Sequence, residues 1–137
     1  MASKLNPPQP SDLEMQVLSV LWRQGPSPVR SVLEALPDGK HRAYTTVLSV
    51  MQVMEKKGLV DHEKQGNAHV YRPLVTRRQV LRPMMRSPVR NVFGGRPVEA
   101  MAALLREGDV SESELSEIRR LIDKAAEDSP VRKDKNS

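Results

Sequence analysis

The sequence predicts a mainly α-helical protein with one small β-hairpin, and three observations support this fold class. Apolar residues recur at helical spacing over most of the chain, and capping signals precede several of these runs. One short segment near the middle alternates between apolar and polar residues instead. The chain has 137 residues, which is enough for one domain or two small modules.

The first helix is expected to follow residues 1–10, which we predict to be disordered. Ser11 and Glu14 have the spacing of a capping box, in which each side chain bonds the main-chain amide of the other residue. Gly25 and Pro26 should end this helix. Its buried stripe is predicted to comprise Leu13, Val17, Leu18 and Leu21.

A second helix is expected to begin with Ser27 as its N-cap and Pro28 at the first helical position. It should end at Pro37, and a turn should follow over residues 38–40. The helix carries an apolar stripe at the same helical spacing: Val29, Val32, Leu33 and Leu36. Two short amphipathic helices of this kind need further elements to bury their apolar faces.

Residues 42–60, RAYTTVLSVMQVMEKKGLV, predict a third helix that ends at Gly58. Its apolar stripe comprises Val47, Val50, Met51 and Met54. A second stripe carries two hydroxyls, one amide and one ammonium, but no carboxylate: Thr45, Ser49, Gln52 and Lys56. Neutral polar residues are common on exposed helices, so solvation alone could explain this stripe. It also suits a helix that lies in a nucleic-acid groove, because phosphates repel carboxylates. Arg42 at its start, and Lys56 with Lys57 at its end, could pair with phosphates.

The apolar period changes after Gly58, where residues 59–64 and 68–72 flank Gln65-Gly66-Asn67. This pattern predicts a β-hairpin. Three helices followed by a hairpin form the winged variant of the helix-turn-helix. Lys64, Asn67 and Arg72 could bind an anionic partner through this wing. Asp61 and Glu63 weaken that prediction, and a solvated hairpin explains the mixed charges equally well.

The segment after the hairpin is rich in arginine and has no acidic residue from Thr76 to Val98. Its arginines could contact DNA, pair with the acidic back half of a partner subunit, or be solvated: Arg77, Arg78, Arg82, Arg86, Arg90 and Arg96. Thr76 and Gln79 cap this segment, but Pro83 and Pro88 should interrupt it. We therefore expect a short or kinked helix over residues 76–91.

Two further helices are expected, from Pro97 to Gly108 and from Ser111 to about Asp128, before a disordered tail over residues 129–137. Ser111 and Glu114 form another capping box. The apolar residues of both helices should point inward: Val98, Met101, Leu104, Leu105, Leu115, Ile118 and Ile122. Because two such short helices cannot enclose their own apolar faces, a second copy of the chain should cover them.

Composition favours an anionic partner and argues against catalysis. The formal net charge is +5 and the chain has no cysteine, which excludes disulfides, thiol nucleophiles and thiolate metal sites. His62 and His69 could face each other across the hairpin, but two imidazoles without a third ligand make a weak metal site. We predict no catalytic residue, metal or cofactor, and we expect Trp22 in the core. Without an apolar run of membrane-spanning length or a signal peptide, the expected localisation is cytoplasmic.

Four segments together resemble the penicillinase repressor family, the BlaI/MecI group: LEMQVLSVLW (13–22), AYTTVLSVMQVMEKKGLV (43–60), AHVYRPLV (68–75) and VFGGRPVEAMAALLREGDVSESELSEIRRLID (92–123). The resemblance implies a winged-helix DNA-binding domain over residues 11–75 and a helical dimerisation domain over residues 76–128. It implies a homodimeric transcriptional repressor that binds a dyad-symmetric, inverted-repeat operator in double-stranded DNA.

By position, the resemblance assigns DNA contacts to Arg42, Tyr44, Thr45, Thr46, Ser49, Lys64, Asn67 and Arg72. The dimer contacts would be Val98, Met101, Leu105, Leu115, Ile118 and Ile122. The chain lacks the Asn-Phe dipeptide at which some family members are cut, and the cysteine pairs of copper-responsive relatives. The sequence therefore does not identify an inducer or a regulatory protease. The alternative function is a winged-helix adaptor that binds another protein, with no nucleic acid.

Overall fold

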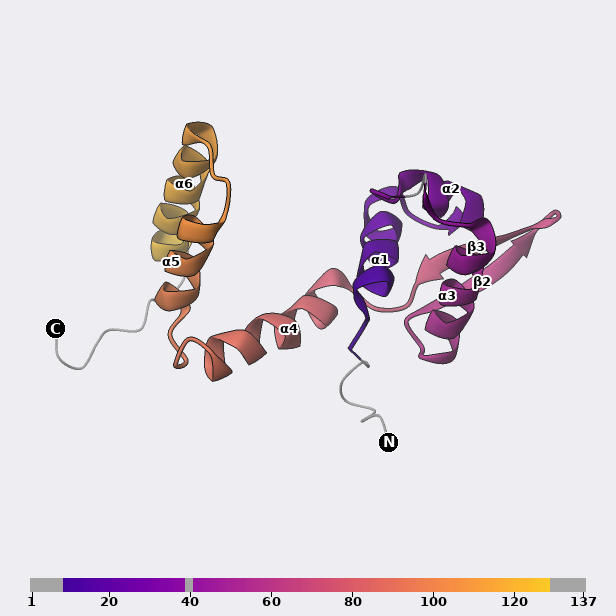
Figure 1. The fold of residues 1–137 in the computed structure, drawn as a ribbon, viewed down its shortest axis with the longest axis horizontal. Coiled ribbons are helices and arrows are strands. Elements are labelled where there is room, and N and C mark those ends of the chain that lie inside the picture. The colour runs from indigo at the N-terminus through magenta and orange to yellow at the C-terminus, as the bar shows by residue number, and fades with distance from the viewer. Residues whose placement is uncertain (1–8, 39–40, 129–137) are drawn as a thin grey trace, which may run out of the picture. The chain divides into compact units, whose positions relative to one another are not determined.

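The computed structural model describes residues 9–38 and 41–128. Disorder was predicted for residues 1–10 and 129–137, and of these residues 1–8 and 129–137 fall outside the described residues, as do Gly39 and Lys40 of the predicted turn. Pro10 is described and is buried, so the predicted disorder does not extend to it. The chain divides into two compact units, Met1–Pro88 and Val89–Ser137. In chain order the elements are α1 (Asp12–Gln24), β1 (Ser27–Pro28), α2 (Val29–Ala35), α3 (Tyr44–Lys56), β2 (Val60–Gln65), β3 (Ala68–Pro73), α4 (Arg77–Asn91), α5 (Pro97–Glu107) and α6 (Glu112–Asp128) (Figure 1).

The mainly helical fold with a small antiparallel sheet confirms the predicted fold class, and α1 begins as expected. The Ser11 main-chain N–H donates to Glu14 Oε1 at 2.8 Å, and the Glu14 N–H donates to Ser11 Oγ at 3.3 Å. Gly25 ends the helix with a φ of 83°, a left-handed value that glycine adopts without steric cost. The capping box and Gly25 each involve residues that are close in sequence, so the local sequence determines where α1 begins and ends.

The start of α2 differs from the prediction. Ser27 and Pro28 form the short strand β1, which pairs with Tyr71 and Val70 of β3. The N-cap of α2 is Pro28, and the Ser27 hydroxyl donates to the carbonyl of Gly25 at 2.8 Å. The prediction of Ser27 as N-cap is therefore wrong, because a distant strand recruits this segment into the sheet.

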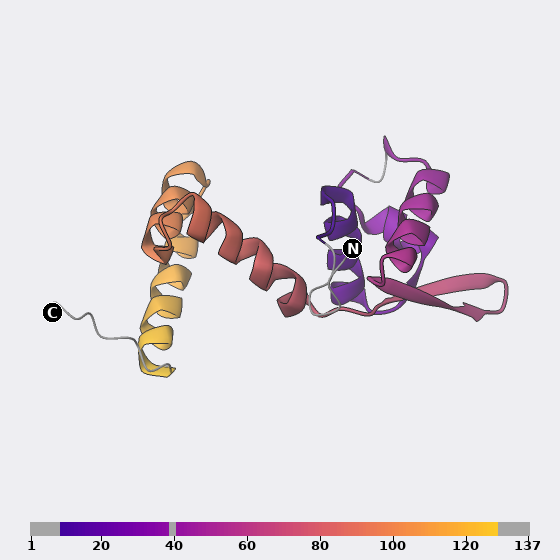
Figure 2. The ribbon, with the colours of Figure 1, turned by 90° about the horizontal axis from the view of Figure 1, so that it is seen from below.

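The sheet has the order β1-β3-β2, with antiparallel pairing throughout. Gly66 and Asn67 connect β2 to β3, and Gly66 has a φ of 62°. Glycine with positive φ at the first of two turn residues is the feature of a type II′ hairpin turn, whose twist matches that of the strands. The hairpin tip projects beyond the helices in both views (Figure 1 and Figure 2).

The core lies in the first unit, among α1, α2, α3, the sheet and the first turn of α4. Its fully or nearly fully buried apolar residues are Val17, Leu18, Val20, Leu21, Val29, Val32, Leu36, Val47, Met51, Met54, Leu59, Val60, Tyr71 and Val80. Leu13, Leu33 and Val50, which the stripes included, are half-buried at its edge. Trp22 is also half-buried, and its Nε1–H donates to the Val75 carbonyl at 2.9 Å.

Helix α4 runs from Arg77 to Asn91 through both prolines, so of the two predicted alternatives the short helix is wrong and a kinked helix stays a prediction. Thr76 and Gln79 start it with a complete capping box, with distances of 2.8 and 3.1 Å. Val80 is only 2% exposed and packs into the core of the first unit. This packing helps to offset the main-chain bonds that Pro83 and Pro88 remove.

The second unit has no buried residue between Val89 and Asp128. The apolar residues predicted to point inward are half-buried at Leu115 and Ile118 and exposed elsewhere, for example 57% at Val98 and 42% at Leu105. An ion pair joins Arg96, which precedes α5, to Glu99 in the first turn of that helix. No helix in the described part of the chain combines the length and the apolar character needed to cross a membrane.

Candidate nucleic-acid interface

The carboxylate-free stripe of α3 faces solvent. Val47, Met51 and Met54 on the opposite side are fully buried, and they fix the rotation of the helix about its axis. The residues turned outward are all exposed: Tyr44, Thr45, Thr46, Ser49, Gln52, Val53 and Lys56. Because most of these side chains are short, the α3 main chain can come close to a partner that lies against it.

Arg42 lies just before α3, and its guanidinium is already paired with a carboxylate. Arg42 Nε donates to both carboxylate oxygens of Asp38 at 2.9 Å, and its terminal nitrogen lies 2.7 Å from Asp38 Oδ2. The hydrogen bond with Arg42 lowers the pKa of Asp38, so this carboxylate stays charged. The structure therefore places Arg42 beside the stripe, and a phosphate would have to share the guanidinium with Asp38 or displace that carboxylate.

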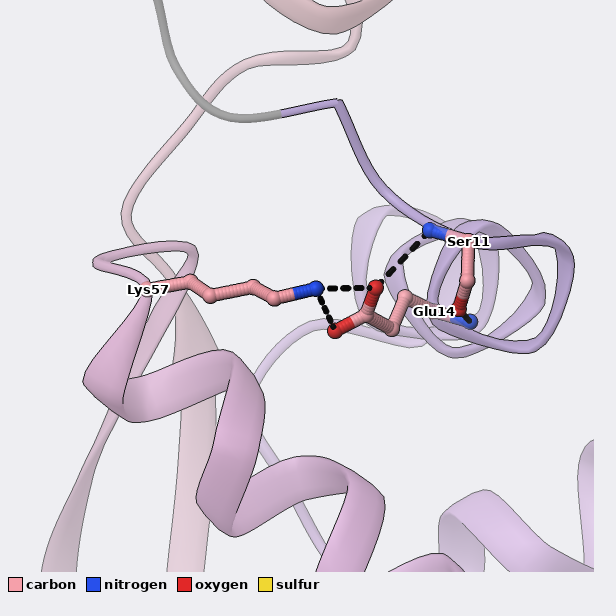
Figure 3. Close-up of polar contacts among 3 residues, drawn as sticks. All are labelled: Ser11, Glu14 and Lys57. Carbon is pink, nitrogen blue, oxygen red and sulfur yellow. Dashed lines mark hydrogen bonds and ion pairs between the residues drawn. The ribbon is translucent and has the colours of Figure 1, made fainter. Parts of the chain in front are cut away.

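The two lysines at the end of α3 differ in their surroundings. Lys56 belongs to the exposed stripe and has no ion-pair partner within the described residues. Lys57 instead extends toward α1, where its Nζ lies 2.9 and 3.0 Å from the two carboxylate oxygens of Glu14 (Figure 3). The suggestion that Lys57 contacts phosphate is not supported, because its ammonium joins the end of α3 to the start of α1.

Glu14 is almost completely buried, with 3% of its surface exposed. Burial raises the pKa of this carboxyl, but the bonds from the Ser11 main chain, the Lys57 ammonium and the Ser11 side chain outweigh burial. The net pKa is lower than usual, so Glu14 is ionised at neutral pH. Glu14 both caps α1 and anchors the end of α3. The sequence spacing predicted only the cap.

The wing separates its charges onto two faces. In an antiparallel pair, residues directly opposite each other share a face. On one face Lys64 stands opposite His69, and His62 stands opposite Tyr71. On the other face Asp61 stands opposite Arg72, and their side chains form an ion pair with distances of 2.6 and 3.1 Å.

Glu63 lies on the same face as Asp61, so both acids of the wing point away from the side that carries Lys64. The hairpin carries mixed charges in the sequence, but in the structure one of its two faces carries no acidic residue. Arg72, a predicted contact, lies on the acidic face, and its hydrogen bond with Asp61 raises the pKa of its guanidinium. Asn67 is exposed in the turn at the tip.

A groove of about 460 Å³ separates the second half of α3 from the acid-free face of the wing. It is lined by Gln52, Glu55, Lys56, His62, His69 and Tyr71. The predicted approach of His62 and His69 is confirmed, because their rings stack with centroids 4.6 Å apart. His62 Nδ1 lies 2.5 Å from Glu55 Oε1. Over residues 9–38 and 41–128, no three metal-ligating side chains come together.

The family model described as penicillinase repressor matches residues 10–124 of this chain. The chain belongs to the penicillinase repressor family. This finding confirms the resemblance carried by the four sequence segments. The matched region includes all of the elements from α1 to α5 and most of α6.

Relatives in the family cover different parts of the chain. The transcriptional regulator BlaI of Mycobacterium tuberculosis is 41% identical over 75 residues, which is 54% of each chain, so the match spans about half of that relative's length. The penicillinase repressor of Bacillus licheniformis is 22% identical over 116 residues, or 85% of this chain and 91% of that one. The methicillin resistance regulatory protein MecI of Staphylococcus aureus is 20% identical over 114 residues, or 83% and 93%. All three of these relatives are named as regulators or repressors.

A solved structure is also similar to this chain: the solution structure of the DNA-binding domain of the repressor BlaI. The TM-score is 0.47 at 28% sequence identity, and the match covers 53% of this chain and 88% of that one. The assignment to the penicillinase repressor family rests on the family model, and the winged-helix description rests on the elements observed here.

Proposed function

We propose that this chain is a transcriptional repressor that binds a specific sequence in double-stranded DNA as a homodimer on an inverted-repeat operator. The observation that carries the proposal is the exposed, carboxylate-free face of α3, which stands beside an acid-free face of the wing. Membership in a family of repressors supports it. Because a repressor acts where the chromosome lies, cytoplasmic localisation is part of the proposal.

The proposed division of labour follows from side-chain chemistry. Thr45, Thr46 and Ser49 present short hydroxyl side chains that can bond base edges, and a threonine methyl can contact the methyl of thymine. Lys56 and Lys64 are exposed cations that would bind backbone phosphates and set the register. Tyr44, Asn67 and the acid-paired Arg42 and Arg72 complete the proposed contacts.

The proposed homodimer forms through the second unit. Its apolar residues are largely exposed in the single chain, and burying them against a second copy removes them from water. The proposed interface comprises Val98, Met101, Leu105, Leu115, Ile118 and Ile122. Two-fold pairing then presents two copies of α3, the proposed recognition helix, to DNA half-sites separated by about 10 base pairs or a multiple of that distance. A bound dimer represses transcription because it excludes polymerase from the promoter.

The experiment first footprints the purified chain on the region upstream of its own gene, and then titrates Thr46→Ala and Lys64→Ala against intact and mutated operators. Thr46→Ala should lose about 1–3 kcal/mol of discrimination at one base pair. Lys64→Ala should weaken binding to every sequence alike and reduce the salt slope by about 1. Full discrimination in the Thr46 variant would refute its role in base reading. An adaptor that binds proteins would instead show no salt-dependent retention on duplex DNA.

A further inference from the structure

The groove between α3 and the wing brings together nitrogen-bearing side chains from two separate parts of the chain. Lys56 contributes to it from α3, and Lys64 lies on the same face of the wing as the stacked pair His62 and His69. Glu55 is the one carboxylate among the residues that line the groove. Asp61 and Glu63 belong to the opposite face of the hairpin.

We propose that this groove binds a backbone phosphate of duplex DNA, and that His62 and His69 bind it in their protonated form. The inference rests on the proposed DNA-binding function and deepens it, because it assigns a ligand class to two residues that the sequence did not connect with DNA. A phosphodiester fits the groove because it is a compact anion with oxygens that accept hydrogen bonds from ammonium and imidazolium groups.

The hydrogen-bond geometry of His62 leaves one donor for a phosphate. When the ring is protonated, both nitrogens carry a hydrogen. Nδ1–H then donates to Glu55 Oε1, with the two heavy atoms 2.5 Å apart, and Nε2–H is available for a second acceptor. Glu55 is thus a positioning residue that fixes the orientation of the ring.

The two histidine rings of the groove lie against each other. The rings of His62 and His69 have centroids 4.6 Å apart and an interplanar angle of 19°. Two imidazolium rings at this separation repel each other, and Lys56 adds another cation to the groove lining. A bound phosphate offsets this repulsion, so DNA binding and proton uptake should be coupled. Tyr71 also lines the groove, but burial raises the pKa of its phenol, which stays neutral in this range.

The sign of the pH dependence follows from this coupling. DNA binding favours the protonated rings, so binding takes up protons. The extra affinity is therefore present at low pH and is lost as the pH rises. The change should fall between about pH 8 and about pH 5.5, the range in which histidine side chains in general gain or lose a proton. Uptake of one proton steepens log K by up to one unit per pH unit.

The experiment uses the full chain and a fluorescein-labelled duplex of random sequence, about three helical turns long. Affinity is measured by fluorescence anisotropy at constant salt between about pH 8 and about pH 5.5. The wild-type chain should bind at least about tenfold more tightly at the acidic end, with a salt slope steeper by about 0.9 for each additional phosphate neutralised. The double variant His62→Gln/His69→Gln should retain binding at the alkaline end and show little pH dependence.

His41→Gln is the matched control, because His41 is exposed but does not line the groove. It should keep the wild-type pH dependence, and circular dichroism should show that all variants are folded. The proposal is overturned if the double variant keeps the full pH dependence or if His41→Gln abolishes it. A chain that binds the duplex equally well at both ends of the range would refute this inference alone. A chain that binds no duplex at any pH would refute the proposed function as well.

Discussion

Replacing Lys57 with methionine should destabilise the first unit, because the change removes the cation from a nearly buried carboxylate. Lys57 Nζ lies 2.9 and 3.0 Å from the two oxygens of Glu14, whose side chain is 4% exposed. Hydrogen bonds to a charged group contribute about 1.5–3 kcal/mol. The Lys57 side chain is 37% exposed, so solvent screening reduces the expected loss to about 1–2 kcal/mol. Methionine keeps most of the apolar stem, which limits the change to the ammonium.

Urea unfolding followed by the fluorescence of Trp22 is a suitable assay. Trp22 is the one tryptophan in the sequence, and its indole bonds Val75, so it reports on the first unit. The matched control is Lys56→Met, which removes a neighbouring lysine from the exposed stripe and should change stability by less than about 0.5 kcal/mol. If the two variants unfold at the same urea concentration, the Glu14–Lys57 pair does not contribute as argued.

The same pair predicts how the difference depends on pH. The pKa of Glu14 is lower in the folded chain than its unfolded value of about 4.3. Its stabilising contribution is therefore fully present above about pH 4.3 and is lost as the pH falls through the folded pKa. The gap in stability between wild type and Lys57→Met should be constant near neutral pH and should narrow in acid. A gap that widens below about pH 4 would contradict this assignment.

Three further changes test other parts of the structure. Leu105→Asp with Ile118→Asp should give a monomer whose first unit stays folded, as judged by sedimentation and Trp22 fluorescence; an intact dimer would contradict the proposed interface. Pro83→Ala should restore a main-chain donor and slow hydrogen exchange in the middle of α4; unchanged exchange would show that the proline does not weaken the helix. Gly66→Ala should cost about 1–2 kcal/mol, because Gly66 has a φ of 62° and nothing within 4 Å that the new methyl would contact. Unchanged urea unfolding would refute this strain.

The sequence predicted best where both partners of an interaction lie close together in the chain. The partners of the boxes at Ser11 and Thr76 are three residues apart, and both boxes are complete in the structure. The box at Ser111 shows one of its two bonds, from the Glu114 amide to the serine hydroxyl at 3.2 Å. The buried stripe of α3 was also predictable, because helical periodicity identifies the side that packs against a core.

The sequence did not show interactions whose partner lies far away in the chain. Ser27 has the sequence of an N-cap, but pairing with Tyr71 draws it into a strand. Lys57 resembles a free cation after α3, but Glu14 holds it from 43 residues away. The continuous α4 has a similar origin, since the burial of Val80 in the core offsets a penalty that local rules assign to proline.

The candidate site shows the same division between local and distant information. The neutral stripe was visible in the sequence because all of its residues belong to one helix. The acid-free face of the wing was not visible in the sequence. Asp61 and Lys64 are close together in the sequence, but the pairing of the strands places them on opposite faces of the hairpin. The predicted DNA contacts and dimer contacts remain proposals, and so does the functional division into residues 11–75 and 76–128. By compactness, the chain divides at Pro88 and Val89.

The lack of any buried residue from Val89 to Asp128 means that the proposed homodimer would connect the packing of this unit to the concentration of the protein. If these helices gain their packing only from a second copy, dilution removes both the dimer and the order of α5 and α6. The melting temperature of this unit should then rise with protein concentration, as it does for obligate dimers. Under the proposed function, a small fall in the cellular amount of the protein would empty the operator more than proportionally, and its synthesis and degradation would then control transcription without a small-molecule inducer.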